Sequence, residues 1–226
     1  MLLGFSYSSP PSPQGDWRGF YMSRRGIVAP EVTVFVDYQN LHMSAHEMWC
    51  DFGTPPEDCL LSPLLVADEL VKGRAPGGVL KEIRVYRGRP DPRKETRLAQ
   101  ATDRQAQAWG MDDPRLRMFR RPLSYPRDFG QPDCHERPRE KGIDVSLAVD
   151  VVRLAIEKRY DVGIVCSRDT DLLPAIEAVM ELHAAHIEVA TWEGASRLRH
   201  SHLGKHLWCH QMNRDTWSRC QDRRAY

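Results

Sequence analysis

The stretch Val32-Thr33-Val34-Phe35-Val36-Asp37 decides the fold class. The five residues before the aspartate are β-branched or aromatic and do not alternate with polar residues, a pattern typical of a strand buried on both faces of a parallel sheet. Parallel strands need crossover connections, which are usually helices. This strand therefore predicts that helices and strands alternate along the rest of the chain.

The sequence that follows contains this alternation. Ser62-Pro63 has the residue types of a helix start, because serine caps a first turn and proline is accepted at the first helical position. In chain order, we predict a helix over residues 63–70, a strand over 79–86, a polar helix over 91–110, a short strand over 116–119, a helix over 143–156, a strand over 162–165, a helix over 172–182 and a strand over 187–191. The predicted fold class is α/β, a three-layer sandwich with a central, mainly parallel sheet.

The chain length of 226 residues is enough for one well-buried core. Residues 1–30 are rich in serine, proline and glycine and show no hydrophobic periodicity, so we predict a disordered N-terminal extension there. We expect the folded domain over residues 31–210 and a basic C-terminal tail over residues 211–226.

Charge and cysteine content limit the class of protein. The formal net charge of +1 gives no overall attraction to nucleic acid, but residues 81–141 contain 16 Lys and Arg against 10 Asp and Glu. The six cysteines include no Cys-x-x-Cys pair, so we expect reduced thiols. We find neither a signal peptide nor an apolar run of about 18 residues, and we therefore expect a soluble, cytoplasmic protein without a membrane segment.

Acidic residues follow two of the predicted strands. Asp37 comes directly after the first strand, and Asp169 and Asp171 come soon after the strand over 162–165. Asp144 lies in the first turn of the helix over 143–156, and Asp150 follows about two turns later. Ligands of open parallel sheets bind beyond the carboxyl ends of the strands, so we expect several of these carboxylates to meet there.

Carboxylates that converge repel one another and lose solvation, and a divalent cation relieves both costs. Mg²⁺ and Mn²⁺ prefer oxygen ligands and suit phosphodiester hydrolysis by in-line attack of an activated water. Single residues have structural alternatives: Asp37 could end a strand or cap a helix, and Asp171 could cap the helix that starts at Leu172. Asp150 is flanked by valines and lies off the Asp144 face, so we expect a supporting hydrogen-bonding role for it.

Three motifs together resemble a known family. They are Val34-Phe35-Val36-Asp37-x-x-Asn40, Lys141-Gly142-Ile143-Asp144 with Asp150, and Cys166-Ser167-Arg168-Asp169-Thr170-Asp171 with Pro174. This set resembles the NYN domain, a branch of the PIN-like nuclease superfamily, over about residues 32–208. The resemblance implies a metal-dependent ribonuclease with Asp37, Asp144 and Asp169 as the metal-binding core and Asp171 as a further acidic member. It also implies supporting roles for Asn40, Lys141 and Ser167, with Lys141 and Ser167 contacting phosphate or positioning the loop.

Two basic features adjoin these motifs. Many NYN members have glycine where this chain has Arg168, which either places a cation beside the scissile phosphate or restricts the backbone. The loop over 123–140 contains Arg127, Arg137 and Arg139, and it is either an RNA-facing flap or an ordinary solvated loop. RNA is the expected partner, while a homodimer or a protein partner stays open.

The same motifs leave other functions open besides a nuclease. A noncatalytic, RNA-binding regulatory NYN module would keep the same acidic pocket. A small-molecule phosphohydrolase is a weaker alternative, because Asp169-Thr170-Asp171 mimics the Asp-x-Asp of dehalogenase-like phosphatases, which normally follows the first strand of that fold. A zinc site is disfavoured at the histidines near the C-terminus, since Gly204 interrupts their helical spacing; these are His200, His202, His206 and His210, with Cys209 nearby.

Overall fold

Six parallel strands form the central sheet of the computed structural model, which describes residues 22–23, 26–27, 29–75, 77–198 and 207–226. The sheet order is β5-β4-β3-β6-β7-β8, and each neighbouring pair is parallel. The strands are β3 (Glu31–Asp37), β4 (Val79–Arg89), β5 (Leu116–Pro122), β6 (Val162–Cys166), β7 (His186–Trp192) and β8 (Trp208–Met212). The stretch that decides the fold class therefore lies in β3, near the middle of the sheet, with β4 and β6 on either side.

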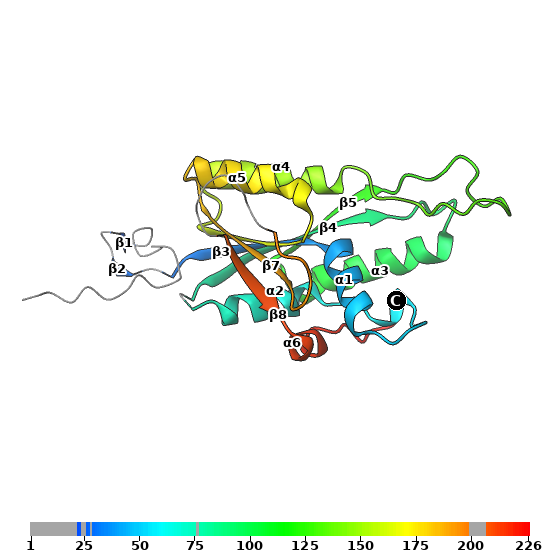
Figure 1. The fold of residues 1–226 in the computed structure, drawn as a ribbon, viewed down its shortest axis with the longest axis horizontal. Coiled ribbons are helices and arrows are strands. Elements are labelled where there is room, and N and C mark those ends of the chain that lie inside the picture. The colour runs from blue at the N-terminus through cyan, green and yellow to red at the C-terminus, as the bar shows by residue number, and fades with distance from the viewer. Residues whose placement is uncertain (1–21, 24–25, 28, 76, 199–206) are drawn as a thin grey trace, which may run out of the picture.

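Helices cover both faces of this sheet (Figure 1). One face packs against α1 (Tyr38–Trp49), α2 (Pro63–Gly73) and α3 (Thr96–Asp112), and the other against α4 (Ile143–Ile156) and α5 (Leu173–Glu181). Shorter elements are β1 (Met22–Ser23), β2 (Gly26–Ile27), the 3₁₀ turns η2 (Pro56–Asp58) and η3 (Thr170–Leu172), and α6 (Arg214–Arg219). The α/β three-layer prediction is confirmed.

Local sequence sets the limits of several elements. Ser62 caps α2 by accepting a hydrogen bond from the Leu65 amide, as its position before Pro63 predicts. The helix predicted over 91–110 begins only at Thr96, because the carbonyl of Asp91 closes a turn with the amides of Lys94 and Glu95. The strand predicted over 116–119 continues to residue 122, since its ladder with β4 extends that far.

The chain after residue 210 packs on the domain, which differs from the predicted basic tail. The β8 strand runs to Met212, and Cys220 is fully buried in the core. Asp222 accepts a hydrogen bond of 2.7 Å from the Trp109 indole. The basic side chains there meet acidic partners, since Arg219 pairs with Glu69 and Arg224 with Asp112 and Asp222. These contacts hold the segment against the domain.

The N-terminal prediction falls largely outside the described residues, which omit 1–21, 24–25 and 28. Within it, β1 and β2 pair antiparallel, with Met22 opposite Ile27. None of the helices in the described part of the chain is long and apolar enough to cross a bilayer.

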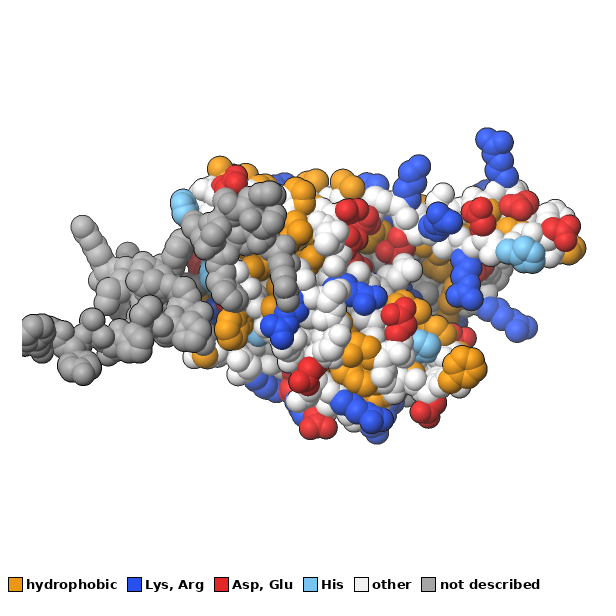
Figure 2. Space-filling model, viewed as in Figure 1, with side chains coloured by type: hydrophobic (Ala, Val, Ile, Leu, Met, Phe, Trp, Pro, Cys, Tyr) orange, Lys and Arg blue, Asp and Glu red, His pale blue; other side chains and the backbone are white. Residues whose placement is uncertain are grey.

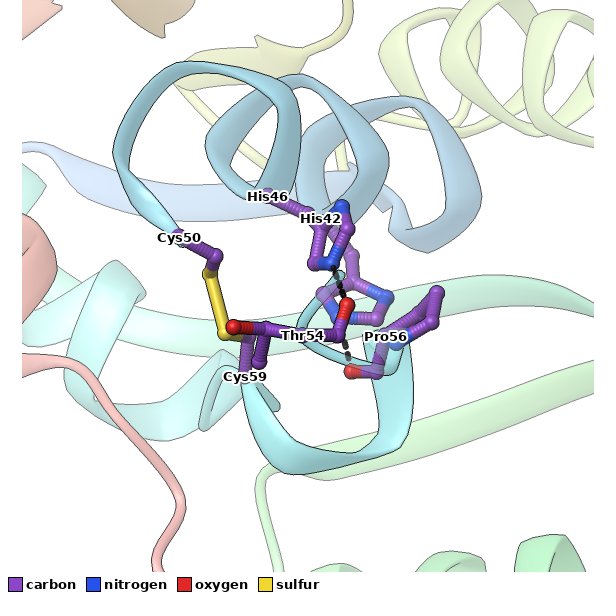
Figure 3. The surroundings of a disulfide bond; sticks show 6 residues. All are labelled: His42, His46, Cys50, Thr54, Pro56 and Cys59. Atoms are coloured by element: carbon purple, nitrogen blue, oxygen red, sulfur yellow. Dashed lines mark hydrogen bonds between the residues drawn. A yellow bond between two sulfur atoms is a disulfide. The ribbon is translucent and has the colours of Figure 1, made fainter. Parts of the chain in front are cut away.

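The expectation that all cysteines are reduced is wrong for one pair. Cys50 and Cys59 form a disulfide, shown in Figure 3. Cys50 caps the end of α1, and Cys59 follows η2, so the bond joins the helix end to the short loop after it. Two positions nine residues apart in sequence become neighbours only when this loop folds back, and linear spacing does not reveal that contact.

Candidate functional site

Asp37 lies at the junction of β3 and α1, at the carboxyl edge of the sheet. Its side chain caps α1 by accepting a hydrogen bond of 3.2 Å from the Asn40 amide. It is 8% exposed. The capping role that the sequence left open is therefore present, and the carboxylate also faces the end of β6.

Two polar side chains connect the β3 end to the β6 end. The Ser167 hydroxyl donates to Asp37 Oδ2 at 3.0 Å and accepts from the Asp169 amide at 3.1 Å. Asn40 Oδ1 accepts from the Arg168 amide at 3.2 Å. Asn40 and Ser167 thus hold the backbone around Asp169 next to Asp37.

The remaining acidic motif residues differ in their surroundings. Asp169 caps η3, because its Oδ1 accepts from the Asp171 amide at 3.0 Å. The Asp171 side chain itself is exposed to solvent. Asp144 lies in the first turn of α4, after Gly142, which has a left-handed φ of 72°. Asp144 and Asp169 lie near enough to Asp37 for their charges to act on its carboxylate.

This proximity appears in the ionisation of Asp37. Its pKa is raised to about 6, chiefly by burial; the hydrogen bonds from the Asn40 amide and Ser167 lower the pKa, and the charges of Asp169 and Asp144 raise it. A buried carboxylate that faces two other carboxylates is electrostatically unfavourable without a cation. The site therefore has unbalanced negative charge.

Asp150 is engaged elsewhere. Its carboxylate accepts hydrogen bonds from Arg84 at 2.7 Å and from the Tyr86 hydroxyl at 2.8 Å, and it also pairs with Arg153. Its oxygens are occupied by these hydrogen bonds, which hold α4 against β4.

Glu140 is a site residue that the sequence analysis missed. It accepts a hydrogen bond from the Gly88 amide, and its pKa is raised to about 7, chiefly by burial; that hydrogen bond and Arg87 lower the pKa, while Asp37 and Asp144 raise it. A β-carbon on Gly88 would come within 2.9 Å of the Glu140 side chain, so this contact needs glycine in β4. In the sequence, Glu140 is one of several charged residues in a long loop, and only the contact with β4 distinguishes it.

The arginines predicted to bind substrate are spread out. Arg127, Arg137 and Arg139 are exposed on the loop over 123–140, which extends away from the sheet (Figure 1). Arg168 approaches Glu47 at 3.5 Å. Lys141 is exposed beside Gly142.

Arg121, which the sequence analysis did not single out, lies beside Gly142, two residues before Asp144 in the chain. A β-carbon on Gly142 would be 3.2 Å from its guanidinium, which places this cation at the start of α4. The β-ladder sets Arg87 opposite Arg120 and Gly88 opposite Arg121. Figure 2 shows Lys and Arg side chains projecting along this end of the molecule. No pattern in the sequence indicates this role for Arg121, because its position beside Gly142 arises only when the start of α4 folds against the end of β5.

The donor set of the acidic site fits a hard divalent cation. Asp37, Asp144, Asp169 and Asp171 offer oxygen atoms alone, which Mg²⁺ and Mn²⁺ prefer. Within the described ranges, no three of these carboxylates bring their oxygens within 4.8 Å of one another. Mg²⁺ retains several waters and usually binds one or two carboxylates together with substrate phosphate.

Comparisons with known proteins agree with the motifs. A family model described as the NYN domain matches residues 31–202. No curated protein matches the sequence. Among solved structures, the crystal structure of a protein of unknown function from Vibrio parahaemolyticus is similar, with 14% sequence identity and a TM-score of 0.41, over 73% of this chain and 81% of that one.

Proposed function

Because this chain belongs to the NYN domain family, a branch of the PIN-like nuclease superfamily, we propose that it is a metal-dependent ribonuclease. The observation that carries the proposal is the electrostatic state of Asp37. Its pKa is raised to about 6 by burial and by Asp169 and Asp144, at the sheet edge where parallel α/β proteins bind ligands. Sites where a protein keeps a carboxylate with a strongly shifted pKa are frequently functional.

Asp37, Asp144 and Asp169 would hold the divalent ion, with Asp171 as an exposed fourth acidic group. A bound Mg²⁺ or Mn²⁺ supplies Lewis-acid stabilisation of charge on the phosphodiester. The residues of the chain perform the positioning. Asn40 and Ser167 fix the Asp37 carboxylate and the backbone before Asp169, so that the ligands are oriented before substrate arrives.

Single-stranded RNA fits the surface beside this site. Arg121 is exposed, and among the described residues it makes no ion pair, so its guanidinium is available to a phosphate. We place the activity in the cytoplasm, where RNA substrates are present.

Arg121→Ala is expected to weaken binding of single-stranded RNA by about tenfold, because one charge-assisted phosphate contact is lost. The salt dependence of binding should also fall, by about 0.7 in the slope of log affinity against log salt. Fluorescence anisotropy at several salt concentrations measures both quantities.

Arg117→Ala is the matched control. Arg117 lies four residues earlier on β5, points to the same face of the strand and pairs with Glu82 away from the aspartates. Equal losses in the two variants would contradict a specific role for Arg121.

Cleavage of labelled single-stranded and structured RNA, with Mn²⁺, Mg²⁺ or EDTA, tests the proposed function. Wild type should cleave only with metal, and Asp169→Asn should reduce the rate on the order of 100-fold, since a partly exposed ligand is lost. RNA binding without cleavage under any metal would instead indicate a regulatory module. Hydrolysis of phosphomonoesters without any action on RNA would indicate a small-molecule phosphohydrolase.

A further inference from the structure

A second group of metal-binding side chains lies at the opposite end of α1 from Asp37. His46 and Cys50 are four residues apart on one face of the last helical turn, and Cys59 approaches them from the loop after η2 (Figure 3). One ligand atom from each of the three lies within 4.8 Å of the others. Within the described part of the chain, no other set of three His, Cys, Asp or Glu side chains is this close.

The donor atoms of this group select a different metal from the aspartate site. Two sulfurs and one imidazole nitrogen are soft or borderline donors, which suit Zn²⁺ and do not suit Mg²⁺. Cys59 is 7% exposed, and His46 and Cys50 are half-buried, so the group is recessed into the surface. In the disulfide form, the two sulfurs are bonded to each other and cannot act as thiolate ligands.

The loop that carries Cys59 is held in place by bonds other than the disulfide. His46 Nε2 and the Thr54 carbonyl oxygen lie 2.7 Å apart, and His42 Nε2 and the Pro56 carbonyl oxygen lie 3.0 Å apart. After Cys59, the Leu61 carbonyl accepts from the Tyr38 hydroxyl in the core. These contacts are independent of the sulfur–sulfur bond, so reduction leaves Cys50 and Cys59 near each other.

We propose that the reduced form of this group is a zinc site, with His46, Cys50 and Cys59 as protein ligands and water as the fourth. Reduction by a thiol reductant converts the disulfide to two thiols and oxidises two reductant thiols to a disulfide. Zn²⁺ then displaces one proton from each cysteine and keeps its oxidation state. The sulfurs need to separate to about 3.8 Å, the spacing of two thiolates on tetrahedral zinc.

The loop that carries Cys59 can therefore be cross-linked to α1 in two ways, by the disulfide or by zinc. The disulfide closes the group in an oxidising environment, and zinc takes its place in a reducing one. The site is separate from the nuclease site, because the 12 residues of α1 span about 18 Å between them. The proposal therefore does not depend on ribonuclease activity.

Titration of the full-length protein with Co²⁺, a spectroscopic substitute for zinc, tests this directly. Protein reduced with a phosphine should develop thiolate-to-cobalt charge-transfer bands and the visible bands of tetrahedral cobalt, saturating at one ion per chain and bleached by Zn²⁺. Cys59→Ser and His46→Ala should lose these bands. Cys134→Ser, which changes a free cysteine on the loop over 123–140, should keep them.

Wild-type protein provides a test that needs no variant. Zn²⁺ should raise the melting temperature of the reduced protein by about 5 °C at saturating concentration and leave that of the oxidised protein unchanged. An absence of thiolate–cobalt bands in reduced wild type would overturn the proposal. Bands of equal strength in Cys59→Ser would overturn it as well.

Discussion

Asp37→Asn is expected to lower RNA cleavage on the order of 1,000-fold while leaving the protein at least as stable as wild type at pH 7. The loss follows from removing the most buried carboxylate of the acidic site. Asparagine keeps an oxygen that can accept from the Asn40 amide, so the cap of α1 survives. A substitution that removes activity without loss of folding distinguishes a functional aspartate from a structural one.

The stability of this variant should depend on pH. The folded state raises the Asp37 pKa from 3.8 to about 6, so the ionised carboxylate destabilises the fold above pH 6. That cost disappears as pH falls from about 6 toward 3.8, because the folded protein then takes up the proton first. Asparagine removes the cost at all pH values, by at most about 3 kcal/mol at pH 7. Its advantage over wild type should therefore shrink at pH 4.

Thermal unfolding in EDTA at both pH values measures this difference. Adding Mg²⁺ or Mn²⁺ at pH 7 should then raise the melting temperature of wild type and leave that of Asp37→Asn unchanged, since only the wild type retains the full ligand set. A variant that is less stable than wild type in EDTA at pH 7, and as active, would show that Asp37 is only a helix cap.

Arg74→Met is expected to destabilise the protein by about 3–5 kcal/mol, because the buried Glu188 carboxylate loses its bidentate arginine partner and keeps only its contacts with His186 and His210. Arg74 is 5% exposed and Glu188 is 3% exposed. The guanidinium bonds both carboxylate oxygens, with Nη2 at 2.8 Å and Nε at 3.0 Å. Burial alone would raise the Glu188 pKa, but hydrogen bonds from His186, His210 and Arg74 outweigh it and lower the pKa.

Urea unfolding at pH 7 measures the effect, and Arg219→Met is the control. Arg219 pairs with Glu69 on the surface and is 56% exposed, so its loss should cost no more than about 1 kcal/mol. The double variant Arg74→Met/Glu188→Leu should recover much of the stability, because both charges leave the interior together. A double variant as unstable as the single one would show that packing, and not the unpaired charge, causes the loss.

Continuous apolar runs made most of the fold predictable. The strands β3, β6 and β7 are buried on both faces, and an uninterrupted apolar run is the sequence pattern that predicts such a strand. The strand β8 was missed because Trp208-Cys209-His210-Gln211-Met212 lacks that pattern. It is an edge strand paired on one side, where the composition of a strand is less restricted.

The candidate site was predictable only where strand ends define it. Asp37 and Asp169 follow buried strands, and the topology brings those two ends together. Glu140 and Arg121 come from a loop and from the far end of β5, so their positions depend on contacts with Gly88 and Gly142 across the chain. No local pattern encodes such contacts. The Cys50–Cys59 disulfide was not predicted, for the same reason.

The central position of β3 has a consequence for synthesis of the protein. Its partner β6 begins at Val162, and the Ser167 hydroxyl that orients Asp37 lies 130 residues downstream. Until β6 has been synthesised, β3 can pair only with β4, and Asp37 remains apart from Asp169. The hydrogen bond from the Trp109 indole forms later still, after Asp222 has been synthesised. The acidic site can therefore form only after β6 and the residues that follow it, through Asp171, have been synthesised.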